Sequence, residues 1–390
     1  MKKKYCIVGT GRQGTAAAYD LLVHAEVETL LLLDCDQNSI NECLKKINSV
    51  SNGVKIQQSI IDFNKIDELK SLLCSVDIFL SSVPYKYNLM LTELAIETAC
   101  SMVDLGGHTG NVIKQLNFDN QAKKKGITIV PDCGMGPGMN VSMGLLAIEQ
   151  FDETHEVRIW DGGLPQNPVG PWNYSLFFNI AGLTNEYDSH AFFIRNGKIK
   201  QVNCFEDYEV IDFGGDIGNL EASVTSGGLS TMPWTFQNKL KVLENKTLRY
   251  LGHWEWMKAY RELGLFKEDE ISFNGHKIIP RDFYHHLLEP HLDTKDYNDV
   301  CIMRVKATGI MDGEKSEVLI DAVETYDEKT NLMAMEKWTG WHASIVMQHI
   351  MAGNLDHGTY PIEKALTGKE FYSQAMKRNY KITINKRKIN

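Results

Sequence analysis

Three glycines near the N-terminus constrain the fold more than any other feature of this chain. Gly9, Gly11 and Gly14 directly follow a short apolar run, and a second apolar run ends at Asp34, twenty residues past the last glycine. Gly9 permits a tight turn from strand to helix, Gly11 lets a ligand approach the backbone, and Gly14 lets the helix pack closely on the strand. The spacing predicts the first strand, turn and helix of a parallel α/β sheet.

The same segment predicts a dinucleotide site. A helix that begins near Arg12 directs free backbone N–H groups and the positive end of its dipole at a phosphate. Asp34 can accept hydrogen bonds from an adenosine ribose, and its charge would repel a 2′-phosphate at that position. Arg12 could instead attract such a phosphate. We give Asp34 more weight and expect NAD, with NADP as the alternative.

Composition describes an ordinary globular protein that is long enough for two domains. The chain has 390 residues, of which 43% are hydrophobic and 23% charged. Its net charge of −9 argues against nucleic acid or an anionic membrane as partner. Basic residues gather between Lys377 and Lys388, but we interpret them as a solvated edge because no aromatic platform accompanies them.

Cysteine and histidine usage gives no sign of a metal or a disulfide framework. The eight cysteines form no C-x-x-C pair, and no H-E-x-x-H occurs among the twelve histidines. The first residues lack the apolar segment and small-residue cleavage site of a signal peptide, and no apolar stretch reaches transmembrane length. We therefore expect a cytoplasmic protein.

The first 150 residues alternate between short apolar runs and longer helical patterns, which predicts a doubly wound, mostly parallel Rossmann sheet. The expected strands are Lys4–Val8, Thr29–Asp34, Val54–Gln57, Val76–Val83, Ser101–Leu105 and Thr128–Val130. The expected helices are Arg12–His24, Ser39–Asn48, Lys65–Cys74, Tyr87–Ala99 and Val112–Lys125.

After Phe151 the pattern changes to alternating apolar and polar residues, which predicts an antiparallel sheet with one solvated face. The expected strands are Glu156–Trp160, Val300–Thr308, Glu317–Thr325 and Met333–Trp338, and the expected helices are Trp254–Leu263, Trp341–Ala352 and Ile362–Arg378. We expect a dinucleotide-binding domain over 1–140, an α+β substrate and dimerisation domain over 141–350, and a C-terminal segment, 351–390, that packs back on the first domain.

Ligands of doubly wound sheets bind beyond the carboxyl ends of the strands. Three loops rich in glycine and polar residues follow expected strands at that edge: Ser81–Tyr85, Asp104–His108 and Pro131–Gly138. In the second domain, Arg249 is suited to a substrate carboxylate because its fork can bind both oxygens. Each loop could instead be a plain strand end, Arg249 could form a surface ion pair, and Trp172 and Tyr174 could be core aromatics.

Several motifs together resemble the saccharopine dehydrogenase-like family. The glycine loop, Ser82-Val83-Pro84-Tyr85, Gly134-Met135-Gly136-Pro137-Gly138, Gly163-Leu164-Pro165 and Thr247-Leu248-Arg249-Tyr250 occur in the family's order. Within the family, Gly163–Gln166, Glu186-Tyr187, Glu221-Ala222 and Thr339-Gly340 are similar to the lysine 6-dehydrogenase branch. The loop before Pro137 departs from saccharopine-type relatives, which tend to carry Leu-Asp where this chain has Met135-Gly136.

The resemblance implies a set of site residues. It assigns cofactor contacts to Gly9, Gly11, Arg12, Gln13, Gly14, Asp34, Ser82, Val83, Pro84 and Gly106. It assigns the substrate wall to Gly163, Trp172 and Tyr174 and the carboxylate anchor to Arg249. For catalysis we select Asp104, as contact to the amine, and Tyr85, with Asp132 and His253 as further polar candidates in substrate binding. The resemblance does not identify the general base.

The implied activity is oxidation of a C–N bond with a nicotinamide cofactor, here the ε-carbon of L-lysine with NAD, to the semialdehyde or its cyclic imine. An NADP-linked saccharopine- or carboxy-polyamine-type reductase is the alternative enzyme. A non-catalytic nucleotide-binding sensor or scaffold on the same fold is the alternative of another class. We expect a homodimer or higher homo-oligomer.

Overall fold

A computed structural model describes residues 2–168, 170–293 and 298–389. The chain divides into two compact units that alternate along the sequence. Unit 1 comprises Met1–Gln150, Ser230–Phe236 and Asp327–Tyr380, and unit 2 comprises Phe151–Leu229, Gln237–Tyr326 and Lys381–Asn390. The three domains expected from the sequence, with boundaries near residues 140 and 350, stay a prediction.

Unit 1 is built on a parallel sheet whose strands follow the order β17-β6-β5-β4-β1-β2-β3. The strands are β1 (Lys3–Val8), β2 (Val27–Asp34), β3 (Lys55–Ile60), β4 (Ile78–Ser81), β5 (Ser101–Asp104), β6 (Thr128–Val130) and β17 (Gly358–Thr359). The order reverses between β1 and β4, as in dinucleotide-binding folds. The predicted doubly wound sheet is confirmed, and the C-terminal segment adds a seventh strand to the six expected.

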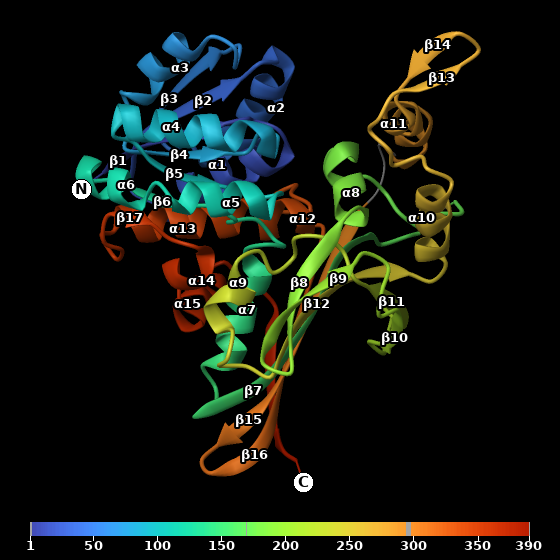
Figure 1. The fold of residues 1–390 in the computed structure, drawn as a ribbon. Helices are drawn as coiled ribbons and strands as arrows, with labels where there is room; N and C mark the ends of the chain where they lie inside the picture. The colour runs from blue at the N-terminus through green and yellow to red at the C-terminus, as the bar shows by residue number, and fades with distance from the viewer. Residues whose placement is uncertain (1, 169, 294–297, 390) are drawn as a thin grey trace. The chain divides into compact units, whose positions relative to one another are not determined.

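Helices α1 to α6 connect the first six strands, and α7 follows β6, as Figure 1 shows from blue to green. They are α1 (Arg12–His24), α2 (Gln37–Ile47), α3 (Ile66–Leu73), α4 (Asn88–Thr98), α5 (Thr109–Leu116), α6 (Asp119–Lys125) and α7 (Met139–Ile148). The bounds of α1 are those predicted. The single helix expected over Val112–Lys125 is wrong, because the chain breaks at Asn117 and Phe118 into α5 and α6.

Both faces of the parallel sheet are buried. Cys6 and Val8 of β1 join an apolar cluster with residues of α3, α4 and α6. Their neighbour Ile7 points to the opposite face and is also fully buried. On α1, Ala16, Ala17 and Ala18 are all inaccessible to solvent, so the small side chains of this helix let it lie close to its neighbours.

The C-terminal part of unit 1 is helical where one strand was expected. It contains α12 (Ala334–Glu336), a π-helical turn over Lys337–Trp341, α13 (His342–Met351), α14 (Ile362–Ala365) and α15 (Gly368–Lys377). The strand predicted at Met333–Trp338 is therefore wrong. Ala, Met, Glu and Lys favour helix over strand. Gly340 also packs on α1 so closely that a Cβ there would lie 2.5 Å from the carbonyl oxygen of Gln13.

A buried ion pair ties this segment to α1. Both side chains, Asp20 of α1 and Arg378 after α15, are fully buried, and they form two hydrogen bonds of 2.7 and 2.8 Å. Bidentate geometry of this kind fixes orientation as well as charge. The pair therefore sets the position of the last helix of unit 1 on the helix that follows the glycine loop.

Unit 2 holds a nine-stranded sheet in which β12 and β7 pair in parallel and the remaining pairs are antiparallel. Its strands are β7 (Glu153–Pro165), β8 (His190–Arg195), β9 (Lys198–Asn203), β10 (Glu209–Asp212), β11 (Asn219–Ser223), β12 (Val242–Tyr250), β15 (Asp299–Met311), β16 (Glu314–Thr325) and β18 (Ile382–Lys388). A turn at Asp312-Gly313 joins β15 and β16, the long orange hairpin of Figure 1.

Three helices complete unit 2: α8 (Ile180–Tyr187), α10 (His253–Glu262) and α11 (Pro280–Leu292). A short hairpin, β13 (Ile271–Phe273) and β14 (His276–Ile278), precedes α11 (Figure 1). The segment Ser230–Phe236, here called the strap, belongs to unit 1. It carries Ser230, Thr231 and α9 (Met232–Phe236), and it lies between β11 and β12 in the chain.

Candidate active site

The three glycines of the first turn occupy positions that differ sharply in the room they leave. Gly9 has a φ of +97°, and a Cβ there would lie 2.8 Å from the carbonyl oxygen of Ser82. At Gly14 a Cβ would lie 1.9 Å from the carbonyl oxygen of Gly9. At Gly11, by contrast, a Cβ would have no described atom within 4 Å. The turn is therefore tight around Gly9 and Gly14 and open at Gly11.

The N-terminus of α1 is available to an anion. Gly11 is its N-cap residue, and no side chain of the described residues caps it. Arg12 is exposed at the first position of the helix, and the Oε1 atom of Gln13 is buried without a hydrogen-bond partner among the described residues. Uncapped N–H groups beside an open glycine form the usual cradle of a pyrophosphate. These residues fit the phosphates of a dinucleotide.

Asp34 ends β2 beside this turn and is nearly buried, with 9% of its surface exposed. Its carboxylate accepts hydrogen bonds from the backbone N–H of Thr10 at 2.6 Å and of Asp36 at 3.0 Å. Asp36 follows two residues later and caps α2. Two carboxylates therefore stand at the end of β2, where a 2′-phosphate would require a cation.

The end of β4 lies against the glycine turn. The hydroxyl of Ser82 donates to the carbonyl oxygens of Gly9 at 2.5 Å and Val8 at 3.1 Å. A Cβ placed on Gly9 would lie 2.9 Å from the Cγ1 atom of Val83. Pro84 precedes a short 3-10 turn that begins at Tyr85. The Tyr85 ring stacks on His108 with centroids 5.4 Å apart.

The ends of β5 and β6 bring two buried acids together. Asp104 is fully buried, and its carboxylate accepts from the backbone N–H groups of Gly106 at 2.8 Å and Asp132 at 3.2 Å and from the Gln115 amide at 2.7 Å. Burial raises the pKa of Asp104. Asp132 is 1% exposed and has a φ of +63°, and the hydroxyl of Ser230 donates to its Oδ2.

Four of the predicted substrate residues form one cluster within unit 2. The guanidinium of Arg249 lies over the Tyr174 ring at 4.8 Å and donates to the Tyr187 hydroxyl at 2.9 Å. His253 bonds the same hydroxyl at 2.9 Å and the carbonyl oxygen of Trp172 at 2.7 Å. Arg249 is 2% exposed, so this cluster is an aromatic cage around a buried cation.

Glu186 completes the cage from α8. It pairs with Nη2 of Arg249 at 3.1 Å, and 31% of its side chain is exposed, against 3% for Arg249. Burial raises the pKa of Glu186, whereas burial and the charge of Arg249 lower the pKa of His253 to about 3. His253 is therefore neutral at physiological pH. Gly163, the remaining candidate, lies inside β7 opposite Cys301 of β15.

The candidate residues thus fall into two groups. In unit 1, the loops after β1, β2, β4, β5 and β6 lie at one edge of the sheet, as the predicted parallel sheet requires. In unit 2, Arg249 lies over Tyr174 and shares the Tyr187 hydroxyl with His253, which also bonds the carbonyl oxygen of Trp172. Sequence reasoning gave no role to Glu186, Ser230 or Glu363. No short motif marks Ser230 or Glu363, which the fold brings to unit 1 from 98 and 231 residues past Asp132.

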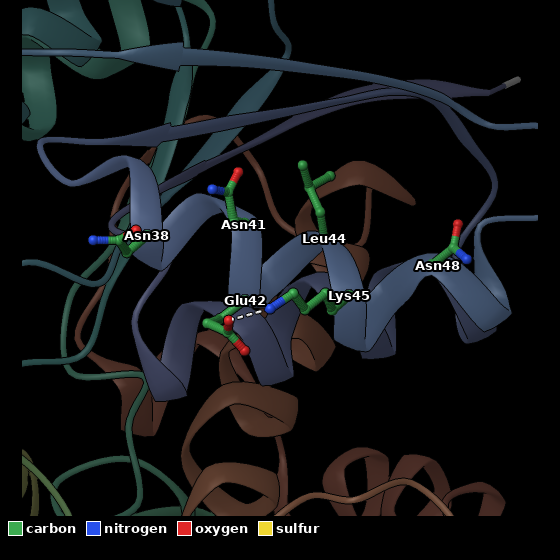
Figure 2. A pocket seen from close by; sticks show the side chains of 6 residues that line it. All are labelled: Asn38, Asn41, Glu42, Leu44, Lys45 and Asn48. Atoms are coloured by element: carbon green, nitrogen blue, oxygen red, sulfur yellow. Dashed lines mark hydrogen bonds and ion pairs between the residues drawn. The ribbon is translucent and has the colours of Figure 1, made fainter.

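Two further findings bear on other kinds of site. A hollow of about 530 Å³ lies along α2 and is lined by Asn38, Asn41, Glu42, Leu44, Lys45 and Asn48 (Figure 2). It contains none of the predicted residues, and its Glu42–Lys45 ion pair is an ordinary exposed one. In the described part of the chain, no group of three or more His, Cys, Asp or Glu side chains could hold a metal, and no helix is long and apolar enough to cross a membrane.

Comparison with known proteins places the chain in a family. Residues 5–130 match the sequence model described as "Saccharopine dehydrogenase NADP binding domain", and residues 134–383 match "Saccharopine dehydrogenase C-terminal domain". The "Alpha-aminoadipic semialdehyde synthase, mitochondrial" of Bos taurus is 24% identical over 87% of this chain. The match covers 35% of that relative, so the chain spans about a third of its length.

Two other similarities cover both proteins more evenly. The "Carboxyaminopropylagmatine dehydrogenase" of Synechocystis sp. is 20% identical over a match that covers 80% of this chain and 79% of that relative. The solved structure of saccharopine dehydrogenase (L-Glu forming) from Saccharomyces cerevisiae superposes with a TM-score of 0.76 at 16% identity and covers all of both chains. The expected resemblance is confirmed: this chain belongs to the saccharopine dehydrogenase family.

Proposed function

We propose that this protein is an NAD(P)-dependent dehydrogenase that oxidises the C–N bond of an amino acid. The observation that carries the proposal is the glycine turn, in which Gly9 and Gly14 admit no side chain and Gly11 stays open beside an uncapped helix. Membership of the saccharopine dehydrogenase family supports the same reading. The nicotinamide cofactor accepts hydride, and the protein's part is to bind, orient and exclude water.

For the cofactor we propose NAD. Asp34 and Asp36 at the end of β2 present negative charge where NADP carries its 2′-phosphate. The family's N-terminal domain is described as NADP-binding, and Arg12 is exposed nearby in the turn, so NADP is the competing choice. Relative affinity for the two cofactors separates these options directly.

For the substrate we propose L-lysine, oxidised at the ε-carbon. The ε-ammonium first loses a proton, and hydride then leaves the ε-carbon, so a C=N double bond forms while the oxidised cofactor is reduced. Water adds to the resulting imine and ammonium leaves, which yields the semialdehyde that can cyclise on its own α-amine. Each step needs a place for a proton and exclusion of bulk water.

Within unit 2, the cage around Arg249 suits a substrate carboxylate. Arg249 is a fixed, desolvated cation whose guanidinium retains N–H groups beyond its bonds to Tyr187, Leu248 and Glu186. A buried guanidinium of this kind can bind both oxygens of an α-carboxylate. The guanidinium lies over the Tyr174 ring and shares the Tyr187 hydroxyl with His253, and we propose that Trp172 and Gly163 belong to the same wall. In unit 1, Asp104 and Tyr85 remain the residues we propose near the amine.

One alternative enzyme has support from the relatives. An NADP-linked saccharopine- or carboxy-polyamine-type reductase would join an aldehyde to an amine. The name of the bovine relative contains a semialdehyde, and that of the Synechocystis relative contains a carboxylated polyamine derivative. A non-catalytic nucleotide-binding sensor would bind a cofactor without turnover. Assembly into a homodimer or higher homo-oligomer and a cytoplasmic location stay predictions.

An absorbance assay at 340 nm tests the proposal. The purified protein is mixed with NAD or NADP and a panel of amino acids and diamines, and the reverse direction is run with NADPH, glutamate and aldehyde–amine pairs. Reduction of NAD with L-lysine is the expected result. Oxidation of NADPH by an aldehyde–amine pair alone would favour the reductase, and cofactor binding without turnover on any pair would favour the sensor.

A further inference from the structure

One buried carboxyl group in unit 1 has an oxygen that the fold leaves unused. The Oδ1 atom of Asp132 is inaccessible to solvent and has no hydrogen-bond partner among the described residues. Its Oδ2 atom accepts from the hydroxyl of Ser230. Buried polar atoms are almost always paired, and an unpaired one in a native structure calls for an explanation such as a bound group or a catalytic role.

The two neighbouring buried acids have no such free atom. Asp104 uses both oxygens on Gly106, Asp132 and Gln115. Glu363 of α14 accepts from Thr231 at 3.1 Å on one oxygen and from Thr235 at 2.7 Å on the other. Asp104 thus holds the loop in place, while Asp132 has an acceptor to offer.

The free oxygen lies at the functional edge of the sheet. Asp132 follows β6, and a Cβ placed on Gly106 after β5 would lie 2.3 Å from Oδ1. The absence of a side chain at Gly106 lets the Asp132 carboxylate lie close to the backbone of the loop after β5. Because the acid for the adenosine ribose ends β2, the nicotinamide half of a dinucleotide belongs over β4, β5 and β6. The oxygen is on the side where the substrate reacts.

The strap fixes this arrangement. Ser230 has a φ of +43°, and Thr231 and Thr235 bind Glu363 on α14, so the strap is held at three side chains. The φ of +63° at Asp132 is also uncommon for a residue with a side chain. Such conformations cost free energy and persist where the surroundings impose them, most often at functional sites.

We propose that Asp132 is the general base of the reaction and that Ser230 tunes it. This inference rests on the proposed function. The Oδ1 atom accepts a proton from the substrate's ε-ammonium, the N–H bond breaks, and its electron pair stays on nitrogen. Hydride then leaves the ε-carbon for the oxidised cofactor and the C=N bond forms, with the proton held on Asp132 until it passes to solvent. Charge and electrons balance without a further reactant.

The groups around Asp132 set its pKa and therefore the pH above which it is deprotonated and can act as a base. Burial raises the pKa of Asp132 well above its ordinary value, and the charges of Asp104 and Glu363 raise it further. The hydrogen bond from Ser230 opposes them and lowers it. Cys133, the next residue, has a thiol whose pKa is raised by burial, so it stays neutral. We therefore expect kcat/KM to rise with pH along a limb that belongs to Asp132.

The test compares Asp132→Asn, Ser230→Ala and the control Ser344→Ala as full-length proteins saturated with cofactor. Ser344 is a fully buried serine on α13 that accepts a hydrogen bond from Gln348, so it matches Ser230 in burial. Asp132→Asn should lower kcat/KM about 10²- to 10⁴-fold. Ser230→Ala should move the acidic limb up by about one to two pH units. Ser344→Ala should leave that limb in place.

The outcomes separate this inference from the proposed function. Turnover by the wild type with an undiminished Asp132→Asn variant, or with the limb unmoved in Ser230→Ala, overturns the role of Asp132 and leaves the proposed function standing. No turnover by the wild type on any amino acid overturns both. Fluorescence titration with the reduced cofactor shows that the variants retain their fold and cofactor site. Infrared titration of aspartate-labelled protein adds a readout without turnover: a protonated-carboxyl band should be lost in Asp132→Asn and should titrate higher in Ser230→Ala.

Discussion

Gly11→Ala and Gly14→Ala form a matched pair that tests the dinucleotide cradle. At Gly14 the new methyl carbon would lie 1.9 Å from the carbonyl oxygen of Gly9 and 2.6 Å from the Ser82 hydroxyl. Contact distances of this kind require the backbone to move by more than 1 Å, roughly the difference from an ordinary van der Waals separation. Overpacking of this severity costs about 3 kcal/mol or more, and we expect the melting temperature to fall by roughly 6–12 °C.

Gly11→Ala should behave in the opposite way. Its φ of −63° suits alanine, and no described atom lies within 4 Å of the added carbon. The free energy of unfolding should change by less than about 1 kcal/mol, because alanine is only somewhat poorer than glycine at an N-cap. The methyl group would nevertheless stand where the pyrophosphate approaches, so the Kd for the cofactor should rise about tenfold or more.

Two assays read out the pair. Thermal unfolding without cofactor reports stability, and fluorescence titration with NADH reports affinity. Added cofactor at about 100 times Kd should stabilise the wild type by about 2.7 kcal/mol and Gly11→Ala by less at the same concentration. A Gly11→Ala variant that keeps both its stability and the wild-type Kd would refute the assignment of this turn to the pyrophosphate.

The remaining predictions concern cofactor choice, the carboxylate anchor and pH. Asp34→Ala should weaken NAD binding far more than NADP binding, and equal losses in a titration would remove its ribose role. Glu186→Gln should lower KM for L-lysine several-fold at constant kcat if a substrate carboxylate displaces Glu186 from Arg249, whereas a higher KM would mean that Glu186 itself binds the substrate. Burial lowers the pKa of His342 to about 4, so the unfolded state takes up a proton first as pH falls below about 6.5. Between about pH 7 and 5.5, the free energy of unfolding should fall by about 1 kcal/mol less in His342→Gln than in the wild type, as measured by denaturant unfolding. An equal fall in both proteins would contradict a buried neutral His342.

Features fixed by local chemistry could be predicted. The bounds of α1 follow from the three glycines, the alanine-rich helix and the strand before it. The parallel pairing of the strands in unit 1 follows from the long helical connections between them. Arg249 could be selected because few side chains bind a carboxylate as its fork does. In the structure Arg249 contacts Tyr174 directly and is linked to His253 and Trp172 through the Tyr187 hydroxyl.

Features fixed by distant contacts could not. The pattern over Met333–Trp338 predicts a strand, but the region is helical, and Gly340 in the following π-helical turn packs closely on α1. Asp104 stays our proposed amine contact, but the sequence could not show that its carboxylate also accepts hydrogen bonds from Gly106 and from Gln115 of α5. Ser230 carries no motif, and only the strap that returns to unit 1 places it on Asp132. Register and burial of this kind depend on the whole fold.

Transfer of label from the substrate to the cofactor directly tests whether the protein oxidises L-lysine at the ε-carbon. L-Lysine deuterated at the ε-carbon is incubated with the enzyme and NAD, and the reduced cofactor and products are analysed by mass spectrometry. We expect deuterium in the reduced cofactor, one equivalent of ammonium and the semialdehyde or cyclic imine. Reduced cofactor without deuterium, or with label only when the α-carbon is deuterated, would contradict oxidation of the ε-carbon.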